Sequence, residues 1–207
     1  MLSNKEAQRL IDTKAIEIDG AAVSENCIIS DASEIKVNGV IKRQKKEFVY
    51  LKFYKPVGFQ SSLNTNVDSN LASFFTNYKN LAIAGRLDKQ SEGLLLLSND
   101  GKWVEELCNP KFEKEKEYNV VVDKTITDQF VFSFKNGVEI DNYLTKKCFC
   151  ERINENTLRI ILTEGKNRQI RKMCKVLGYH VLTLKRIRIS NLLLTDIQPG
   201  NIEFIKI

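Results

Sequence analysis

Residues 85–101 read GRLDKQSEGLLLLSNDG. Arg86 and Asp88 lie close together in a loop that leads directly into the apolar run Leu94–Leu97, which stops at polar turn residues. A short apolar run between turn residues is typical of a buried strand. A loop beside such a strand is held rigidly, and loops on rigid scaffolds commonly carry chemistry. Asp88 is therefore a charged group next to the core. The local pattern fits either a functional carboxylate or a structural ion pair with Arg86.

The same segment closely resembles the catalytic motif of the RsuA/RluB/RluE/RluF family of pseudouridine synthases. Three further blocks resemble motifs of this family in the expected order: Lys55–Gly58 (KPVG), Lys116–Tyr118 (KEY) and Gly165–Met173 (GKNRQIRKM). The resemblance covers the chain from residue 48 to about residue 200. It implies that Asp88 is the essential catalytic residue, that Tyr118 is the active-site tyrosine, and that Arg171 pairs with Asp88.

Residues 144–148 and 167–174 are most similar to the RluF branch, which acts on large-subunit ribosomal RNA. The resemblance therefore implies ribosomal RNA as the partner, 23S rather than 16S, with a tRNA as a candidate second substrate. It implies an isomerase, which consumes no second substrate. We expect no cofactor, because the sequence holds no phosphate-binding glycine-rich loop and no dinucleotide fingerprint.

The remaining pattern predicts an α+β chain in which a mixed, largely antiparallel sheet is flanked by helices. Strands are expected at 48–54, 81–84, 118–122, 146–152 and 158–163, and helices at 71–75, 103–108, 128–134 and 167–177. Several of the joins between them are hairpin-like. The resemblance implies that residues 48–207 form a catalytic domain with the pseudouridine synthase fold.

The N-terminal region predicts a small separate lobe over residues 1–41. Ser3 and Glu6 form a capping box at a helix start, and short alternating strands follow at 15–19 and 33–38. This unit resembles the back half of an S4 RNA-binding domain whose first helix is missing, so we expect a truncated S4-like lobe. The alternative is a simple lobe packed on the catalytic domain. Residues 42–47 are expected to be a basic linker, with Lys42, Arg43, Lys45 and Lys46.

The charge balance suits a polyanionic partner. The chain has 32 lysines and arginines against 26 acidic residues, a formal charge of +6. Basic residues beside the apolar stripe of the 167–177 helix, and in the strand after it, are expected to form an RNA track: Arg168, Lys172, Lys175, Lys185, Arg186 and Arg188. A solvated basic face is the alternative. Arg86 is expected to fill the gap left by a flipped nucleotide, and Lys55 to support its turn or a phosphate.

Other classes of site find little support in the composition. The five cysteines are scattered, Cys148 and Cys150 do not have zinc-ribbon spacing, and His180 is the single histidine, so no metal site is expected. Reduced thiols indicate a cytoplasmic protein. The sequence holds neither a membrane-spanning apolar run nor a signal peptide, and we expect a monomer.

Isomerisation of uridine breaks the N-glycosidic bond and forms a carbon–carbon bond, with positive charge developing at C1′. Asp88 could stabilise that charge, act as nucleophile or remove a sugar proton, and the sequence does not choose among these roles. Two alternatives from other classes stay open. One is a non-catalytic RNA-binding protein, and the other is a glycosidase that uses Asp88 and Glu92 as its carboxylate pair.

Overall fold

The computed structural model describes residues 3–30 and 32–206, and it divides into one compact unit that ends at Phe48 and a second that begins at Val49. No helix within the described ranges is both long and apolar enough to cross a lipid bilayer.

The first unit contains one helix and four short strands: α1 (Asn4–Asp12), β1 (Ile16–Ile18), β2 (Ala21–Ala22), β3 (Ile35–Val37) and β4 (Val40–Arg43). The expected capping box is confirmed, since the Ser3 hydroxyl accepts from the Glu6 amide at 3.3 Å and the Ser3 amide donates to the Glu6 carboxylate at 2.7 Å. The strands form an antiparallel sheet in the order β2-β1-β3-β4. The likeness of this unit to an S4 domain stays a prediction.

This unit extends beyond the expected boundary at residue 41. Lys42 and Arg43 lie in β4 rather than in a linker, because the Arg43 guanidinium donates to the Ser33 carbonyl at 2.9 Å and to the Ser30 carbonyl at 2.7 Å. A basic residue of an expected solvated run is thus part of the local fold.

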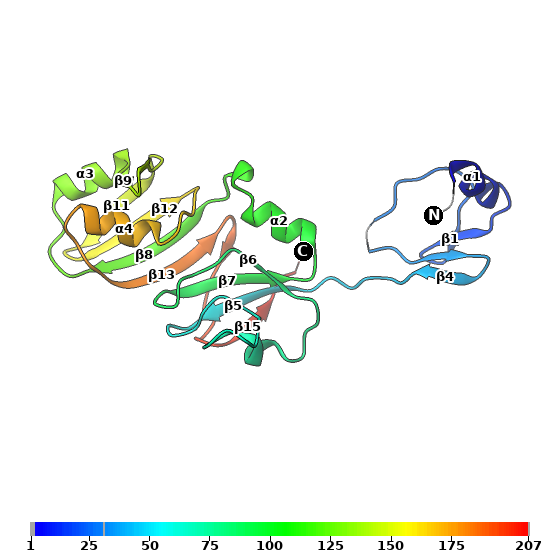
Figure 1. Cartoon of the computed structure of the whole chain (residues 1–207), viewed down its shortest axis with the longest axis horizontal. Helices are drawn as coiled ribbons and strands as arrows, with labels where there is room; N and C mark the ends of the chain where they lie inside the picture. The colour runs from blue at the N-terminus through cyan, green and yellow to red at the C-terminus, as the bar shows by residue number, and fades with distance from the viewer. Residues whose placement is uncertain (1–2, 31, 207) are drawn as a thin grey trace. The chain divides into compact units, whose positions relative to one another are not determined.

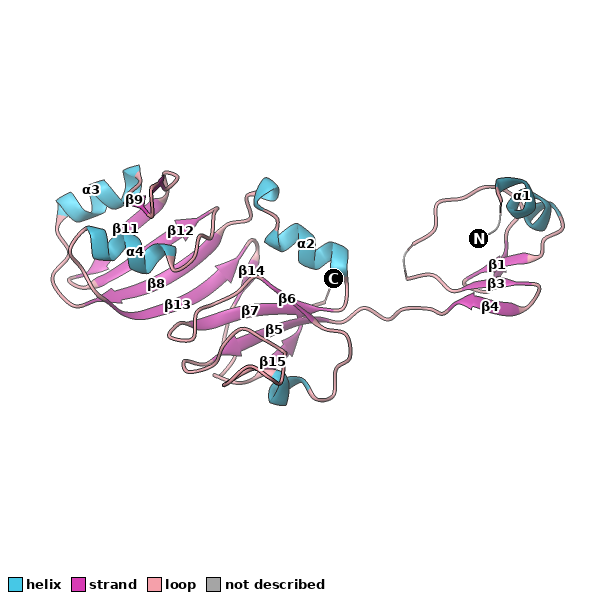
Figure 2. Cartoon of the chain, viewed as in Figure 1, coloured by secondary structure: helices cyan, strands magenta, loops and turns pink. Residues whose placement is uncertain are grey.

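The second unit is built on one large mixed sheet, as predicted. In the described residues its nine strands are β5 (Tyr50–Lys55), β6 (Ala82–Ala84), β7 (Glu92–Ser98), β8 (Lys116–Val122), β11 (Phe149–Asn154), β12 (Thr157–Leu162), β13 (Val181–Ile189), β14 (Leu192–Leu193) and β15 (Ile202–Phe204). The main path runs β11-β12-β8-β13-β7-β5-β15 (Figure 2). The pairing of β13 with β7 is parallel, and the other strand pairs are antiparallel.

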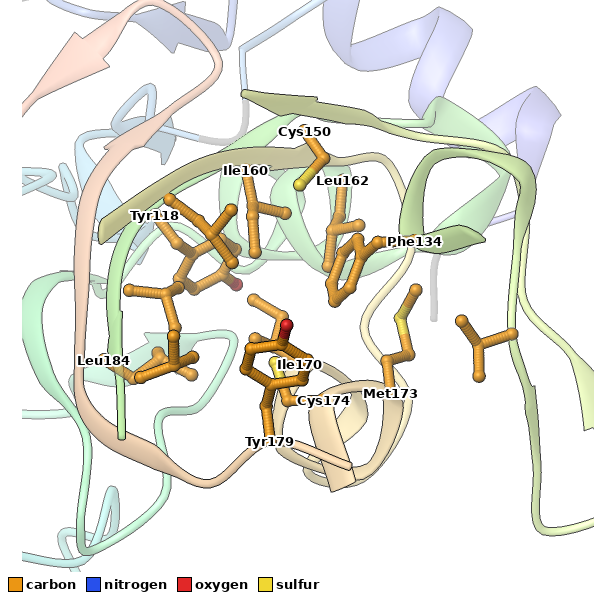
Figure 3. Close-up of a cluster of buried hydrophobic side chains, with 14 of the residues drawn as sticks. Tyr118, Phe134, Cys150, Ile160, Leu162, Ile170, Met173, Cys174, Tyr179 and Leu184 are labelled. Atoms are coloured by element: carbon orange, nitrogen blue, oxygen red, sulfur yellow. The ribbon is translucent and has the colours of Figure 1, made fainter. Parts of the chain in front are cut away.

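Helices and a small hairpin complete this unit: α2 (Gly101–Cys108), α3 (Asp128–Asn136), α4 (Gln169–Val176), the 3₁₀ turns η1 (Ala72–Phe75) and η2 (Pro110–Phe112), and the paired strands β9 (Glu139–Ile140) and β10 (Tyr143–Leu144). Figure 1 shows α3 and α4 together over β8 and β12. Their buried side chains, including Phe134, Ile170 and Met173, pack on Ile160 and Tyr118 of the sheet (Figure 3).

Strand β7 lies in the middle of the core. Leu94, Leu95, Leu96 and Leu97 have no exposed surface. Because side chains alternate across a strand, Leu94 and Leu96 pack beside α2, whereas Leu95 and Leu97 pack with Phe53 and the η1 segment. Burying each leucine contributes about 1.5–3 kcal/mol, so this strand is a rigid base for the loop that precedes it.

Candidate active site

The Asp88 loop, residues 85–91, joins β6 to β7 and is fixed at several points along its backbone. The Ser61 hydroxyl donates to the Leu87 carbonyl at 2.8 Å and accepts from the Leu87 amide at 3.0 Å. The Gly58 amide donates to the Lys89 carbonyl at 2.8 Å, which ties the KPVG turn to the loop. The Leu87 side chain is buried in the core. Asp88 therefore stands on a loop whose backbone has little freedom, as the sequence predicts.

One row of residues crosses the sheet beside this loop. The strand register pairs Lys55 of β5 with Gly93 of β7, Gly93 with Arg186 of β13, and Arg186 with Tyr118 of β8. Directly paired residues in neighbouring strands point to the same face. The Lys55, Arg186 and Tyr118 side chains thus share one face of the sheet, and all three are buried.

Gly93 makes this arrangement possible. Its φ of +107° is in a region that side chains disfavour, and a Cβ at this position would lie 2.2 Å from the Arg186 carbonyl oxygen. The absence of a side chain lets β7 and β13 pair closely at the point where the Asp88 loop enters the sheet.

A cleft of about 340 Å³ opens between the Asp88 loop and α4. The predicted site residues that line this cleft are Arg86, Asp88, Tyr118, Arg168, Arg171 and Arg186. Its volume lies in the range of small-molecule sites. The cleft therefore joins three of the four sequence motifs in space, whereas Lys55 of the KPVG motif does not line it.

The ion pair at Asp88 differs from the expected one. The Arg168 guanidinium lies 3.7 Å from the Asp88 carboxylate, and both side chains are partly exposed. Arg168 is the N-cap residue of α4 with a left-handed φ of +51°, rather than a member of the helix. This backbone conformation could not be read from the apolar stripe of the helix. Arg168 also donates to the Gln90 side chain at 3.1 Å, which keeps its guanidinium over the loop.

Arg171 does not pair directly with Asp88 among the described side chains, contrary to expectation. It donates to the Gln90 carbonyl at 2.8 Å, to the Ser91 hydroxyl at 3.3 Å and to the Val181 carbonyl at 3.1 Å. Burial lowers the pKa of this guanidinium, the Arg168 charge adds to that, and the Asp88 charge opposes it. Arg171 therefore anchors the end of the Asp88 loop to β13. Its interaction with the Asp88 carboxylate is electrostatic and involves no direct hydrogen bond.

Lys55 has no exposed surface, and its ammonium group donates to the Pro56 carbonyl at 2.8 Å, which supports the KPVG turn. Burial lowers the pKa of Lys55 to about 8, although the Asp88 and Glu92 charges act in the opposite direction. Lys116, which the sequence analysis did not single out, lines the cleft. Burial lowers the pKa of Lys116 as well, and the Arg186 charge adds to the effect. Lys116 is the first residue of the KEY motif, and this position could have identified it as a candidate site residue.

The expected RNA track is not one continuous surface. Arg186 is only 2% exposed and lies in the row described above. Lys185 and Arg188 point to the opposite face, where the Lys185 ammonium lies 4.8 Å from the Tyr54 ring centroid and Arg188 donates to Glu117 at 2.6 Å. Lys172 forms an ion pair with Asp141, whereas Lys175 is exposed on the last turn of α4. Strand alternation, which the charge pattern did not consider, separates these residues.

The structure also weakens the proposed glycosidase pair. Glu92 accepts a hydrogen bond from the Tyr54 hydroxyl at 2.8 Å, and it pairs in register with Lys185 rather than with the residues of the row. Burial first, and then this carboxylate, raise the pKa of Tyr54 to about 12. Glu92 does not line the cleft that holds Asp88. No cluster of three His, Cys, Asp or Glu side chains suitable for a metal ion occurs in residues 3–30 and 32–206.

Comparison with known protein families resolves the class of the site. Residues 49–175 match the family model described as RNA pseudouridylate synthase. The chain belongs to this family. It is therefore an RNA-modifying enzyme, an isomerase that acts on uridine, and the predicted family and fold are confirmed.

Relatives across most of the chain place it within the RluF branch of the pseudouridylate synthases. It is 38% identical over 96% of its length to the dual-specificity RNA pseudouridine synthase RluF of Salmonella typhi, covering 69% of that protein. It is 36% identical, with the same coverage, to RluF of Escherichia coli K12. It is 28% identical to ribosomal large subunit pseudouridine synthase B of Bacillus subtilis, over 96% of this chain and 85% of that one.

Solved structures agree with the family and the fold. A crystal structure of a pseudouridylate synthase superposes with a TM-score of 0.73 at 27% identity, covering 99% of this chain and 91% of the other. The archaeal Nop10–Cbf5 complex of the box H/ACA particle shares the fold over 72% of this chain and 49% of the other, with a TM-score of 0.50 and 20% identity. The cleft that holds Asp88 thus lies in the fold of a pseudouridylate synthase.

Proposed function

We propose that this pseudouridine synthase isomerises a specific uridine of 23S ribosomal RNA, with Asp88 acting at C1′ of the flipped nucleotide. The Salmonella and Escherichia relatives are named dual-specificity RluF, and the Bacillus relative is named for the large ribosomal subunit. The Bacillus name favours 23S over 16S RNA. The words 'dual-specificity' favour a second substrate, for which a tRNA is our candidate. We infer that the enzyme acts in the cytoplasm as a monomer.

The observation on which this proposal depends is the position of Asp88. Its carboxylate stands on a fixed loop in a cleft beside Tyr118, and the nearest guanidinium is 3.7 Å away. A nearby cation favours the ionised form of a carboxylate. An ionised carboxylate can stabilise the positive charge that develops at C1′, attack C1′, or accept a sugar proton. All three roles require an ionised carboxylate.

A base must leave the RNA stack before an enzyme can act on its glycosidic bond. Tyr118 lines the cleft, and we propose that its ring stacks on the extruded uracil. Arg86 is an exposed residue of the Asp88 loop. We propose that its side chain occupies the space that the flipped nucleotide leaves in the RNA stack. Arg168 and the exposed Lys175 of α4 are our candidates for phosphate contacts.

Release of tritium from RNA labelled at uridine C5 tests this proposal directly. We expect release from transcribed 23S RNA, less or none from 16S RNA, and a measurable rate with tRNA. Asp88→Asn should abolish release and leave RNA affinity within a few-fold of wild type, because the amide keeps the shape of the carboxylate and loses its charge. Asp68→Asn is the matched control, since Asp68 lies in an exposed loop outside the cleft and should keep full activity.

The outcomes separate the alternatives that the sequence left open. Release of free uracil with an abasic product would identify a glycosidase, and tight RNA binding without tritium release would identify a non-catalytic binding protein. Activity of Asp88→Asn near the wild-type rate would remove Asp88 from the mechanism.

A further inference from the structure

Arg186 connects the Asp88 loop to strand β7. Its Nε donates to the Leu94 carbonyl at 2.8 Å, just after the loop, and its Nη1 donates to the Arg86 carbonyl at 3.4 Å, within the loop. The side chain is 2% exposed, and it lines the floor of the cleft. A buried guanidinium that bridges these two carbonyls restricts how far the catalytic loop can move.

The third nitrogen of this guanidinium has no partner. Nη2 is buried without a hydrogen-bond acceptor, and no carboxylate lies within ion-pair distance of Arg186 among residues 3–30 and 32–206. An arginine stays charged in proteins, and an unpaired buried charge is strongly unfavourable. The nearby ammonium groups of Lys55 and Lys116 do not neutralise it, because they are also cations. Among the described residues that line the cleft, two buried donors have no partner, Nη2 of Arg186 and Nε of Arg171. Arg171 has three other hydrogen bonds and lies near the Asp88 charge, whereas Arg186 has only carbonyl partners.

The depth of Arg186 limits which part of an RNA substrate can reach it. The phosphates of an RNA strand stay outside a cleft, where exposed cations such as Arg168 can meet them. The base of a flipped nucleotide enters furthest. Tyr118, the register partner of Arg186 on β8, shares its face of the sheet. A uracil stacked on Tyr118 would bring its carbonyl oxygens towards the neighbouring guanidinium.

We propose that Nη2 of Arg186 donates a hydrogen bond to a carbonyl oxygen of the extruded uracil and stabilises the negative charge which that base carries during isomerisation. The inference rests on the proposed function. When the C1′–N1 bond breaks, the uracil keeps the electron pair and becomes an anion, with charge shared by its ring oxygens. C5 then bonds to C1′ and loses its proton, N1 gains a proton, and nothing else is consumed. A fixed donor aimed at developing charge is an effective form of electrostatic catalysis.

The experiment combines protein and RNA substitutions in single-turnover tritium release at saturating RNA. The substrate is an RNA fragment that spans the modified uridine, made with uridine, 2-thiouridine or 4-thiouridine at that position, since sulfur is a poorer acceptor than oxygen. For wild type we expect one of the two thio substitutions to slow release clearly. Arg186→Met should slow release of the uridine substrate by about a hundredfold, the loss seen for an oxyanion donor, and should lose its sensitivity to sulfur. RNA affinity should change little.

Lys79→Met is the control, because it removes an exposed cation outside the cleft, and it should keep both the rate and the sulfur sensitivity. Arg186→Lys should stay slow, since a lysine cannot bridge both loop carbonyls and also reach the base. If Arg186→Met does not fold, the wild-type comparison still decides: no rate difference among the three substrates overturns the proposal. Equal sulfur effects in wild type and Arg186→Met would limit Arg186 to holding the loop. A wild-type enzyme that releases no tritium from any RNA would instead overturn the proposed function.

Discussion

Arg186 and Arg188 lie two residues apart on one strand, yet they have opposite environments. Arg188 donates to Glu117 at 2.6 Å and pairs with Glu115 at 3.0 Å, so its charge is compensated. Arg186 is more deeply buried and faces a cleft without a carboxylate partner among the described residues. A register shift between these two residues places an extra residue in β13 and turns Arg188 to the other face. On one face of the sheet, Arg188 forms ion pairs with two glutamates. On the other face, Arg186 has no ion-pair partner among the described residues, and we propose that it interacts with the substrate.

The paired face should account for stability rather than activity. Glu117 is buried and accepts from Arg159 at 2.7 Å and from Arg188 at 2.6 Å. Burial acts to raise the pKa of Glu117, but these two hydrogen bonds outweigh it and lower the pKa. Glu117→Gln should destabilise the fold by about 3 kcal/mol, because it weakens two hydrogen bonds to charged groups, each worth about 1.5–3 kcal/mol. Denaturant unfolding at pH 7 measures this, and the rate of tritium release per folded molecule should be unchanged.

The pH dependence of that loss has a definite sign. A carboxylate whose pKa is lowered on folding contributes stability above its unfolded value, 4.5 for Glu117, and loses it as the pH falls through the folded value. The difference between wild type and Glu117→Gln should therefore shrink in acid. A constant difference from neutral pH into acid would mean that packing, not charge, accounts for the effect.

The active-site row should be most sensitive at Gly93. Gly93→Ala adds a Cβ 2.2 Å from the Arg186 carbonyl oxygen, in a backbone conformation that alanine disfavours. Overpacking and backbone strain together should destabilise the fold by about 3 kcal/mol or more. Gly101→Ala is the matched control, since an added Cβ there has no neighbour within 4 Å and Gly101 begins α2. Thermal unfolding of both variants compares them, and equal midpoints would refute the role assigned to Gly93.

Lys55 tests whether a buried ammonium group near the active site reduces stability. Folding lowers its pKa from 10.5 to about 8, mainly through burial, so the unfolded chain binds more protons between these values and stability should rise with pH there. Lys55→Met should be more stable than wild type below pH 8, by an amount on the order of 3 kcal/mol. This advantage should fade towards pH 10.5. Unfolding free energies across the pH series would show parallel curves if the ammonium group had no such effect.

Arg168 and Arg171 separate charge pairing from loop anchoring. Arg171→Ala removes three hydrogen bonds to the Asp88 loop and β13, so it should lower the single-turnover rate sharply even at saturating RNA. Arg168→Ala removes a partly exposed ion pair, typically worth about 1 kcal/mol or less, and should lower the rate several-fold. A larger rate loss for Arg168→Ala than for Arg171→Ala would contradict the anchoring role that we assign to Arg171.

The smallest effect is expected at the surface of α4. Replacing Lys172 and Lys175 with Gln should weaken RNA binding and flatten its salt dependence, because each phosphate contact releases counterions. The rate at saturating RNA should not change. The double variant of Lys45 and Lys46 to Gln provides a comparison in the first unit, where we expect smaller effects. Affinities measured across a salt series decide between them, and an unchanged slope for both variants would place the RNA path elsewhere.

The sequence predicted the longer elements of the catalytic domain, but not the short strands β9, β10, β14 and β15. Six of the predicted site residues line the cleft, because the motifs that carry them are short and strongly patterned. Asp88 and Tyr118 lie far apart in the chain and line one cavity, as the resemblance implied. The error at the predicted RNA track arises from side-chain direction. Lys185, Arg186 and Arg188 were treated as one basic cluster, although neighbours in a strand face opposite ways. The register shift in β13 could not be read from residue types.

The N-cap conformation of Arg168 also depends on tertiary context. A helical stripe predicts Arg168 and Arg171 on one helix face, but the left-handed backbone at Arg168 redirects that side chain to Asp88. The anchoring of Arg171 to the Gln90 carbonyl depends on where the loop passes the helix, which no local pattern contains.

Strand β13 pairs with β8 on one side and β7 on the other, and this has a consequence for the order of folding. Its partner residues at 92–93 and 185–186 are far apart in sequence, and such pairings form slowly because a long loop must close first. Until β13 inserts, β7 and β8 each present an open edge to other chains. A nascent chain that lacks β13 would already contain Asp88 and Tyr118 but no floor to the cleft. The cleft is therefore complete only when β13 has paired with β7 and β8, and the same pairing covers the open edges of both strands.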